Sequence, residues 1–170
     1  MVDILQVLAV LLVAVAMSLA LAHALELPGK MRLSKEAYYA MQPIYYPGFT
    51  IGGFAEPAGL ILTIILLFVT PWGTADFWLT LAALLGLIAM QATYWLLTHP
   101  VNKFWLRGQN LSGLGSGFFS FGTSRSRTRN EPRSTEWTNL RDQWEYSHVA
   151  RAGLALASLT LLVIAISDGS

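Results

Sequence analysis

Four long apolar stretches dominate the pattern of hydrophobic and polar positions along the chain. They run from residue 4 to 25, from 53 to 72, from 77 to 98 and from 148 to 167. A helix needs about 20 mostly apolar residues to cross a hydrocarbon core about 30 Å thick, and each stretch has about that length. The pattern predicts an all-α, polytopic membrane protein in which residues 1–170 form one domain, an antiparallel four-helix transmembrane bundle.

The connections between these stretches have patterns of their own. Residues 34–46 carry four tyrosines, which predicts an interfacial helical turn with its aromatic rings at headgroup level. Residues 108–134 are rich in glycine, serine and arginine and predict a mobile cytoplasmic loop, with an anionic-lipid contact as the alternative. Nucleic acid is not expected as a partner, because aromatic residues do not alternate with these arginines.

After that loop the apolar pattern returns before the fourth span begins. Trp137, Leu140 and Trp144 recur at steps of three and four residues, which is typical of a helix with one apolar face. The sequence therefore predicts that a helix from about residue 135 runs directly into the fourth span as its cytoplasmic extension.

Composition agrees with a membrane location. Hydrophobic residues make up 54 % of the chain and charged residues 12 %, about half of the roughly 25 % usual in soluble domains. The chain has no cysteine, which excludes a disulfide framework, a thiolate nucleophile and a zinc–thiolate site. The net charge of +1 indicates no acidic partner.

The basic residues lie on one side of the predicted bundle. Three of the eleven fall between spans one and two, and the other eight lie between residue 103 and Arg151 at the start of span four. The positive-inside rule then places both basic connections in the cytoplasm and both termini outside, in a multi-pass protein of the cell inner membrane. A cleaved signal peptide is not expected, because the start Met1-Val2-Asp3 lacks a basic region.

Small residues at helical spacing predict where the spans pack together. Small side chains allow close approach of helix backbones in a membrane. The predicted packing face of span three consists of Ala82, Gly86, Ala89 and Thr93. That of span four consists of Gly153 and Ala157, and that of span one of Ala14, Ser18 and Ala22.

Ionisable residues gather at the predicted cytoplasmic ends of the spans. The three histidines, His23, His99 and His148, all fall at such ends. Acidic or basic neighbours accompany them, namely Glu26, Glu56, Glu145 and Arg151. Ionisable groups at membrane depth cost free energy unless they are paired, so a shared layer of them indicates a functional site. We expect Arg151 to meet Glu56, Glu145 or a ligand beside an aromatic-lined cavity, and His148 to meet His23 or Glu56.

Four interpretations of this layer remain open. The pairs His23-x-x-Glu26 and Glu145-x-x-His148 resemble the one-turn ligand pairs of di-iron bundles. His23 with His99 or His148 is a possible haem clasp. The histidines and Glu56 are also suited to proton transfer, with Arg151 stabilising an anionic intermediate. The fourth interpretation is a network that only ties helix ends together. No cofactor is predicted, and a metal or haem stays an alternative.

Four segments resemble a known family. They are LAHALELPGK at 21–30, IYYPGF at 44–49, THPVN at 98–102 and WTNLRDQWEYSHVARA at 137–152. Together they look like a bacterial branch of the anthrone-oxygenase-like family of small four-span membrane proteins. The resemblance implies oxidation of an anthrone to an anthraquinone by molecular oxygen, apparently without a metal or flavin. The residues that match and are suited to such chemistry are His99, Trp144, His148 and Arg151.

These observations predict a membrane-embedded oxygenase or oxidoreductase that acts on a quinol- or anthrone-like aromatic at the cytoplasmic interface. The candidate catalytic residues are His148, Arg151, His23, Glu56 and His99, and the candidate substrate-binding residues are Trp144, Tyr45 and Tyr46. The alternative is a non-catalytic accessory or assembly subunit of a larger membrane complex. The expected partners are the lipid bilayer, a hydrophobic aromatic small molecule and other membrane subunits.

Overall fold

The computed structural model describes residues 2–45, 48–105 and 134–167, and these residues form helices and short connections without a strand. In chain order the elements are α1 (Val2–Lys30), α2 (Lys35–Met41), the 3-10 turn η1 (Gln42–Tyr45), α3 (Gly48–Gly53), α4 (Ala55–Val69), α5 (Ala75–Thr93), the π-helical turn η2 (Tyr94–Thr98), α6 (His99–Trp105) and α8 (Ser134–Ser167). The predicted all-α class is confirmed for this part of the chain.

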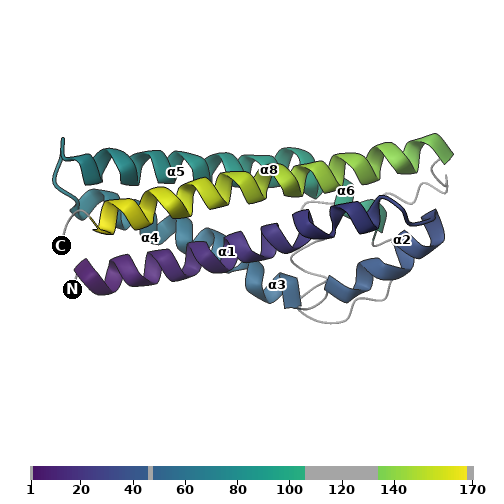
Figure 1. Cartoon of the computed structure of the whole chain (residues 1–170), viewed down its shortest axis with the longest axis horizontal. Coiled ribbons are helices and arrows are strands. Elements are labelled where there is room, and N and C mark those ends of the chain that lie inside the picture. The colour runs from purple at the N-terminus through teal and green to yellow at the C-terminus, as the bar shows by residue number, and fades with distance from the viewer. Residues whose placement is uncertain (1, 46–47, 106–133, 168–170) are drawn as a thin grey trace.

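Four helical segments are long and apolar enough to cross a membrane. They are Val2–Lys30, Gly48–Val69, Ala75–Asn102 and Trp137–Ser167. Figure 1 shows α1, α4, α5 and α8 side by side, with both termini at one end and α2 and α6 at the other. The four predicted spans are therefore present as helices.

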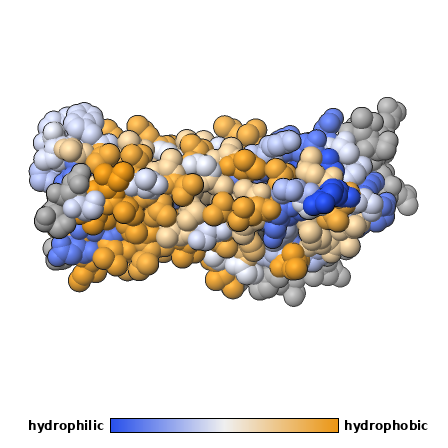
Figure 2. Space-filling model, viewed as in Figure 1, coloured by the Kyte–Doolittle hydropathy of each residue, from blue (hydrophilic) through white to orange (hydrophobic). Residues whose placement is uncertain are grey.

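The outer surface of the bundle is apolar. Figure 2 shows an apolar band over the middle of the molecule, with hydrophilic residues gathered at the end where α2 lies. Large side chains in this band point outward, among them Phe68 at 85 % exposure and Leu96 at 72 %. A soluble protein rarely exposes so extensive an apolar patch, which suggests a membrane protein.

The first span is longer than predicted. Helix α1 does not end near Leu25 but continues to Lys30. The Lys30 ammonium forms an ion pair with Glu26 one turn earlier, at 2.9 Å, and such i,i+4 pairs stabilise a helix. The additional turn carries Lys30 into the interior, where its side chain is 2 % exposed.

The third span also continues past its predicted end at His99-Pro100. Proline lacks the N–H that would bond the carbonyl four residues earlier, and its ring clashes with that carbonyl in a regular α-helix. Here the turn η2 precedes Pro100, and the His99 N–H bonds the carbonyl of Tyr94 five residues back. A π-helical turn of this kind shifts the local backbone, and the chain continues helically as α6 to Trp105.

The fourth span has the predicted extension. Helix α8 is a single helix of 34 residues, which at about 1.5 Å per residue reaches about 51 Å and exceeds a hydrocarbon core of about 30 Å. The helix therefore carries residues well beyond the apolar band. The second span ends earlier than predicted, because α4 ends at Val69 and Thr70 takes an extended conformation before Pro71, as residues preceding a proline prefer.

The predicted packing faces are mostly wrong by one or two positions. On α1 the buried small residues are Ala16 and Ala20, and not Ala14, Ser18 and Ala22. On α8 the buried positions include Ala152 and Ala155, whereas Gly153 and Ala157 are exposed. On α5, Ala82 and Ala89 are exposed. Small residues occur all around these helices, so their spacing alone does not select the buried face.

Gly86 is the exception, because it does lie at a helix contact. A Cβ atom at Gly86 would collide with the Ser158 hydroxyl of α8. We expect Gly86→Leu to lower the thermal stability of the purified protein, by about 1–3 kcal/mol in free energy of unfolding, as overpacking does. A Cβ at Gly153 would meet no atom within 4 Å, so Gly153→Leu is the matched control and should melt as the wild type does. Equal melting of the two variants would contradict the α5–α8 contact.

Candidate functional site

A cavity of about 190 Å³ opens where α1, η1, α3, α4, α5, η2, α6 and α8 meet. Nearly half of the residues that line it carry a ring. The aromatic and imidazole rings around it are His23, Tyr45, Phe49, Tyr94, Trp95, Trp105, Trp144 and His148. The other polar groups around it are Gln42, Glu56, Gln91, Thr98, Asn102 and Arg151. An apolar cavity with a few convergent polar groups is the usual form of a small-molecule site.

Two histidines from different helices lie against each other in this wall. The ring centroids of His23 on α1 and His148 on α8 are 4.2 Å apart. The Trp144 ring packs 4.2 Å from His148, and the Tyr45 ring packs 4.5 Å from His23. The helices approach this closely because small side chains meet at their contact, among them Ala16, Ala20, Ala152 and Ala155.

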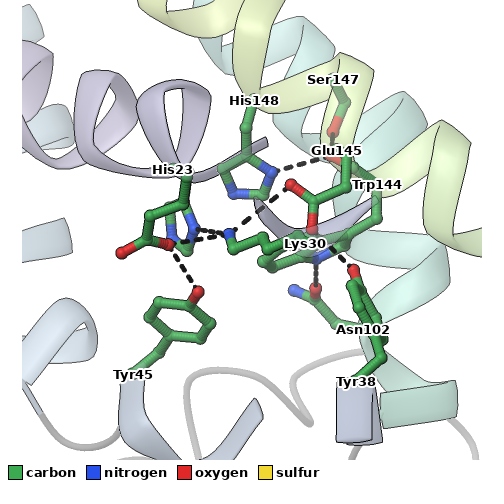
Figure 3. Close-up of polar contacts among 10 residues, drawn as sticks. His23, Lys30, Tyr38, Tyr45, Asn102, Trp144, Glu145, Ser147 and His148 are labelled. Atoms are coloured by element: carbon green, nitrogen blue, oxygen red, sulfur yellow. Dashed lines mark hydrogen bonds and ion pairs between the residues drawn. The ribbon is translucent and has the colours of Figure 1, made fainter. Parts of the chain in front are cut away.

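A buried ionic network borders the histidine pair (Figure 3). The Lys30 ammonium nitrogen lies 2.9 Å from Glu26, 3.5 Å from Glu145 and 3.1 Å from Nδ1 of His23. Glu145 is fully buried, and one of its carboxylate oxygens accepts a hydrogen bond of 2.8 Å from the Tyr38 hydroxyl. A buried charge is tolerated only when it is paired and hydrogen-bonded, so each member of this network depends on the others.

The two tyrosines that serve this network are held in the protonated form. Burial raises the pKa of Tyr38, and the Glu145 carboxylate raises it further. Burial also raises the pKa of Tyr45, whose hydroxyl donates to Glu26 at 2.7 Å. Both hydroxyls therefore remain hydrogen-bond donors to carboxylates over the whole physiological pH range.

A second ion pair crosses the cavity from α8 to α4. The Arg151 guanidinium pairs with the carboxylate of Glu56, which also accepts a hydrogen bond of 3.1 Å from Gln91. The guanidinium lies 5.1 Å from the centre of the Tyr94 ring, within the range of a cation–π interaction. The expectation that Arg151 meets a carboxylate beside an aromatic-lined cavity is confirmed.

Several hydrogen-bond donors around the cavity make no hydrogen bond within the described part of the chain. They are Nε2 of Gln42, Nδ2 of Asn102, Nε1 of Trp105 and Nε of Arg151. All four side chains are at least nine-tenths buried, and buried polar groups are almost always partnered in folded proteins. Because all four groups donate, the cavity fits a ligand that brings acceptor oxygens.

In the arrangement described, the rings of His23 and His148 do not hold a metal between them. A metal held between two imidazoles keeps each ligating nitrogen about 2 Å from the ion, whereas these rings pack directly against each other. Nδ1 of each ring already faces a protein group, Lys30 or the Trp144 carbonyl. Within residues 2–45, 48–105 and 134–167 no group of three histidine, aspartate or glutamate side chains could hold a metal ion.

The structure brings most of the predicted site residues together. Of the predicted site residues, those that line the cavity are His23, Tyr45, Glu56, Trp144, His148 and Arg151. His148 meets His23 as expected, whereas Glu56 pairs with Arg151. His99 is not in the cavity wall, and its ring packs against Trp95 at 5.0 Å. Tyr46 lies outside the described residues.

Some cavity residues were missed from the sequence although a signal was present. Gln91, Tyr94, Thr98 and Asn102 follow one another at steps of three, four and four residues, which is one polar face on an otherwise apolar helix. His99 lies next to that face and not on it. Lys30 follows His23 by seven residues, about two helical turns, so the two side chains share a face.

No family model, curated protein or solved structure matches this chain. The functional argument therefore depends on the geometry of the cavity.

Proposed function

We propose that this chain is a membrane-embedded oxidoreductase or oxygenase that acts on a quinol- or anthrone-like aromatic at the cytoplasmic interface of the cell inner membrane. The observation that carries this proposal is the cavity itself. Aromatic rings form its wall, and buried N–H donors without partners, Arg151 and two histidines surround the same space. Such a site suits a planar ring that bears oxygen atoms.

The size of the cavity favours a single ring. An engineered apolar cavity of about 150 Å³ binds benzene, and drug-sized ligands occupy pockets of about 300–1,000 Å³. The volume here is about 190 Å³, which accommodates one substituted ring. A three-ring anthrone would have to extend beyond it. A quinol head group is therefore the first candidate, and an anthrone is the second.

The proposed chemistry begins with proton removal from the ligand. A histidine accepts the hydroxyl proton of the quinol, and Arg151 with the buried donors stabilises the phenolate. Dioxygen then takes two electrons and two protons, so that quinol and O₂ give quinone and hydrogen peroxide. With an anthrone, the proton leaves the benzylic carbon, O₂ adds to that carbon, and loss of one water leaves the anthraquinone.

Oxygen consumption by the purified protein tests this function. The protein in lipid nanodiscs would be mixed with tetramethylhydroquinone, and separately with 1,8-dihydroxyanthrone, while an oxygen electrode and the absorbance of the product are followed. We expect a saturable rate above the spontaneous rate. Failure to bind either compound, or its oxidised form, would refute the proposal. Stoichiometric co-purification with other membrane subunits, without any such rate, would favour the accessory-subunit interpretation.

The orientation belongs to the same proposal. We propose that the four spans run antiparallel, with the basic connections in the cytoplasm and both termini on the periplasmic side. The reason is that all eleven basic residues fall, in the sequence, between spans one and two or between span three and the start of span four. A reporter fused after Ser170 should be active in the periplasm, and one inserted within residues 108–134 should be active in the cytoplasm. Two reporters in the same compartment would contradict a four-span topology.

A further inference from the structure

The two cavity histidines differ in the group that faces Nδ1. On His148, Nδ1 lies 2.8 Å from the backbone carbonyl oxygen of Trp144 (Figure 3). A carbonyl only accepts hydrogen bonds, so Nδ1 of His148 must carry the hydrogen. In the neutral imidazole the lone pair then lies on Nε2. His148 thus has an acceptor free for a ligand.

His23 has the opposite arrangement. Its Nδ1 lies 3.1 Å from the Lys30 amine. The same nitrogen forms ion pairs with the carboxylates of Glu26 and Glu145 at 2.9 and 3.5 Å, as an ammonium does. An ammonium only donates, so Nδ1 of His23 accepts and the ring hydrogen is on Nε2. His23 thus has a donor free for a ligand.

We propose that His148 and His23 are held in opposite tautomers, so that His148 is the base of the cavity and His23 is its hydrogen-bond donor, with Lys30 as the positioning residue that sets the tautomer of His23. Among the described residues, the hydrogen bonds of both rings are made at Nδ1. Both rings line the same cavity and their centroids are 4.2 Å apart, so one ligand can meet both.

The assignment divides one proton transfer between two residues. The O–H bond of the ligand breaks and an N–H bond forms at Nε2 of His148, whose Nδ1–H continues to donate to the Trp144 carbonyl. The ligand oxygen becomes an oxyanion and accepts a hydrogen bond from Nε2–H of His23. The proton stays on His148 until an oxygen of the reduced dioxygen takes it. The proton transfer rests on the proposed function. The assignment of the two tautomers does not depend on it.

Nitrogen NMR of the free protein tests the tautomers. The chain has only three histidines, so a ¹⁵N-histidine-labelled sample in nanodiscs gives three ring patterns, which His99→Gln and His148→Gln variants assign. Two-bond nitrogen–hydrogen correlations distinguish a ring protonated at Nδ1 from one protonated at Nε2. We expect His148 to be protonated at Nδ1 and His23 at Nε2. The same tautomer on both rings would overturn the inference.

Substitutions at Lys30 test its role. Lys30→Arg retains a cationic donor, so His23 should stay protonated at Nε2, whereas Lys30→Met should leave both tautomers of His23 populated and His148 unchanged. Arg32→Met is the matched control, because Arg32 is exposed and its side chain donates a hydrogen bond to the Pro28 carbonyl. An unchanged His23 pattern in folded Lys30→Met would refute the role of Lys30. If Lys30→Met does not fold, the wild-type and Lys30→Arg spectra decide. No quinol is needed, so failure of the oxidation assay and failure of this inference are separate results.

Discussion

Replacing Arg151 by methionine is expected to lower the free energy of unfolding by about 3–5 kcal/mol, the usual cost of removing one partner from a buried ion pair. Glu56 would keep only its hydrogen bond from Gln91 and would remain as an uncompensated charge inside the bundle. The same variant should lose binding of tetramethylquinone, because the cavity loses its cation. Thermal melting and quinone titration in nanodiscs measure the two effects.

Two further variants separate stability from binding. In the double variant Glu56→Leu with Arg151→Met, apolar side chains replace the whole pair, and much of the lost stability should return, whereas quinone binding should not. Arg141→Met is the matched control, because Arg141 pairs with Asp142, whose side chain is 40 % exposed, and such pairs contribute about 0–1 kcal/mol. Equal loss of stability in Arg141→Met and Arg151→Met would contradict the special role of the Arg151–Glu56 pair.

Replacing His148 by glutamine is expected to lower the rate of quinol oxidation by a factor of about 10²–10⁴, the usual contribution of a general base. Glutamine retains hydrogen-bonding groups of similar reach but does not take up a proton at neutral pH. Binding of the quinone should change much less than the rate, because the aromatic wall and Arg151 remain. Steady-state oxygen consumption and a binding titration on the same preparation distinguish the two quantities.

His99→Gln is the matched control for this prediction. His99 carries the same imidazole at the same end of the molecule, but it lies outside the cavity wall and packs against Trp95. Its replacement should leave the oxidation rate within a factor of about two of the wild type, as expected of a substitution away from the reacting groups. A large loss in His99→Gln with a normal rate in His148→Gln would reverse the assignment of the base.

The meeting of His23, Glu56, His148 and Arg151 was predictable because depth in a membrane follows from position along a span. Each of these residues lies near the polar end of its own apolar stretch, and helices of similar length bring equivalent depths together. What could not be predicted is which partner each residue takes. The sequence left open whether Glu56 meets His148 or Arg151, and the structure pairs it with Arg151, because pairing depends on how each helix is rotated about its axis.

That rotation is weakly encoded in this chain. In a soluble bundle the polar stripe of each helix faces water and identifies the buried face. Here the outward face is as apolar as the interior, and small residues lie on several faces of the same helix. The buried contact between α1 and α8 contains Ala16, Ala20, Ala152 and Ala155, where the helix backbones approach closely. The spacing of small residues alone predicted positions next to these.

By itself the sequence determined the four apolar spans, the basic residues on one side and the long fourth helix, because these depend on length, hydropathy and charge along the chain. Only the tertiary structure decided that α5 continues past Pro100 through a π-helical turn and so places Asn102 in the cavity wall. It also decided that Lys30 is buried against Glu145 of α8. The reason is physical: a lysine at the end of a span is stable in water, and it is stable inside only where folding brings a further buried partner such as the Glu145 carboxylate.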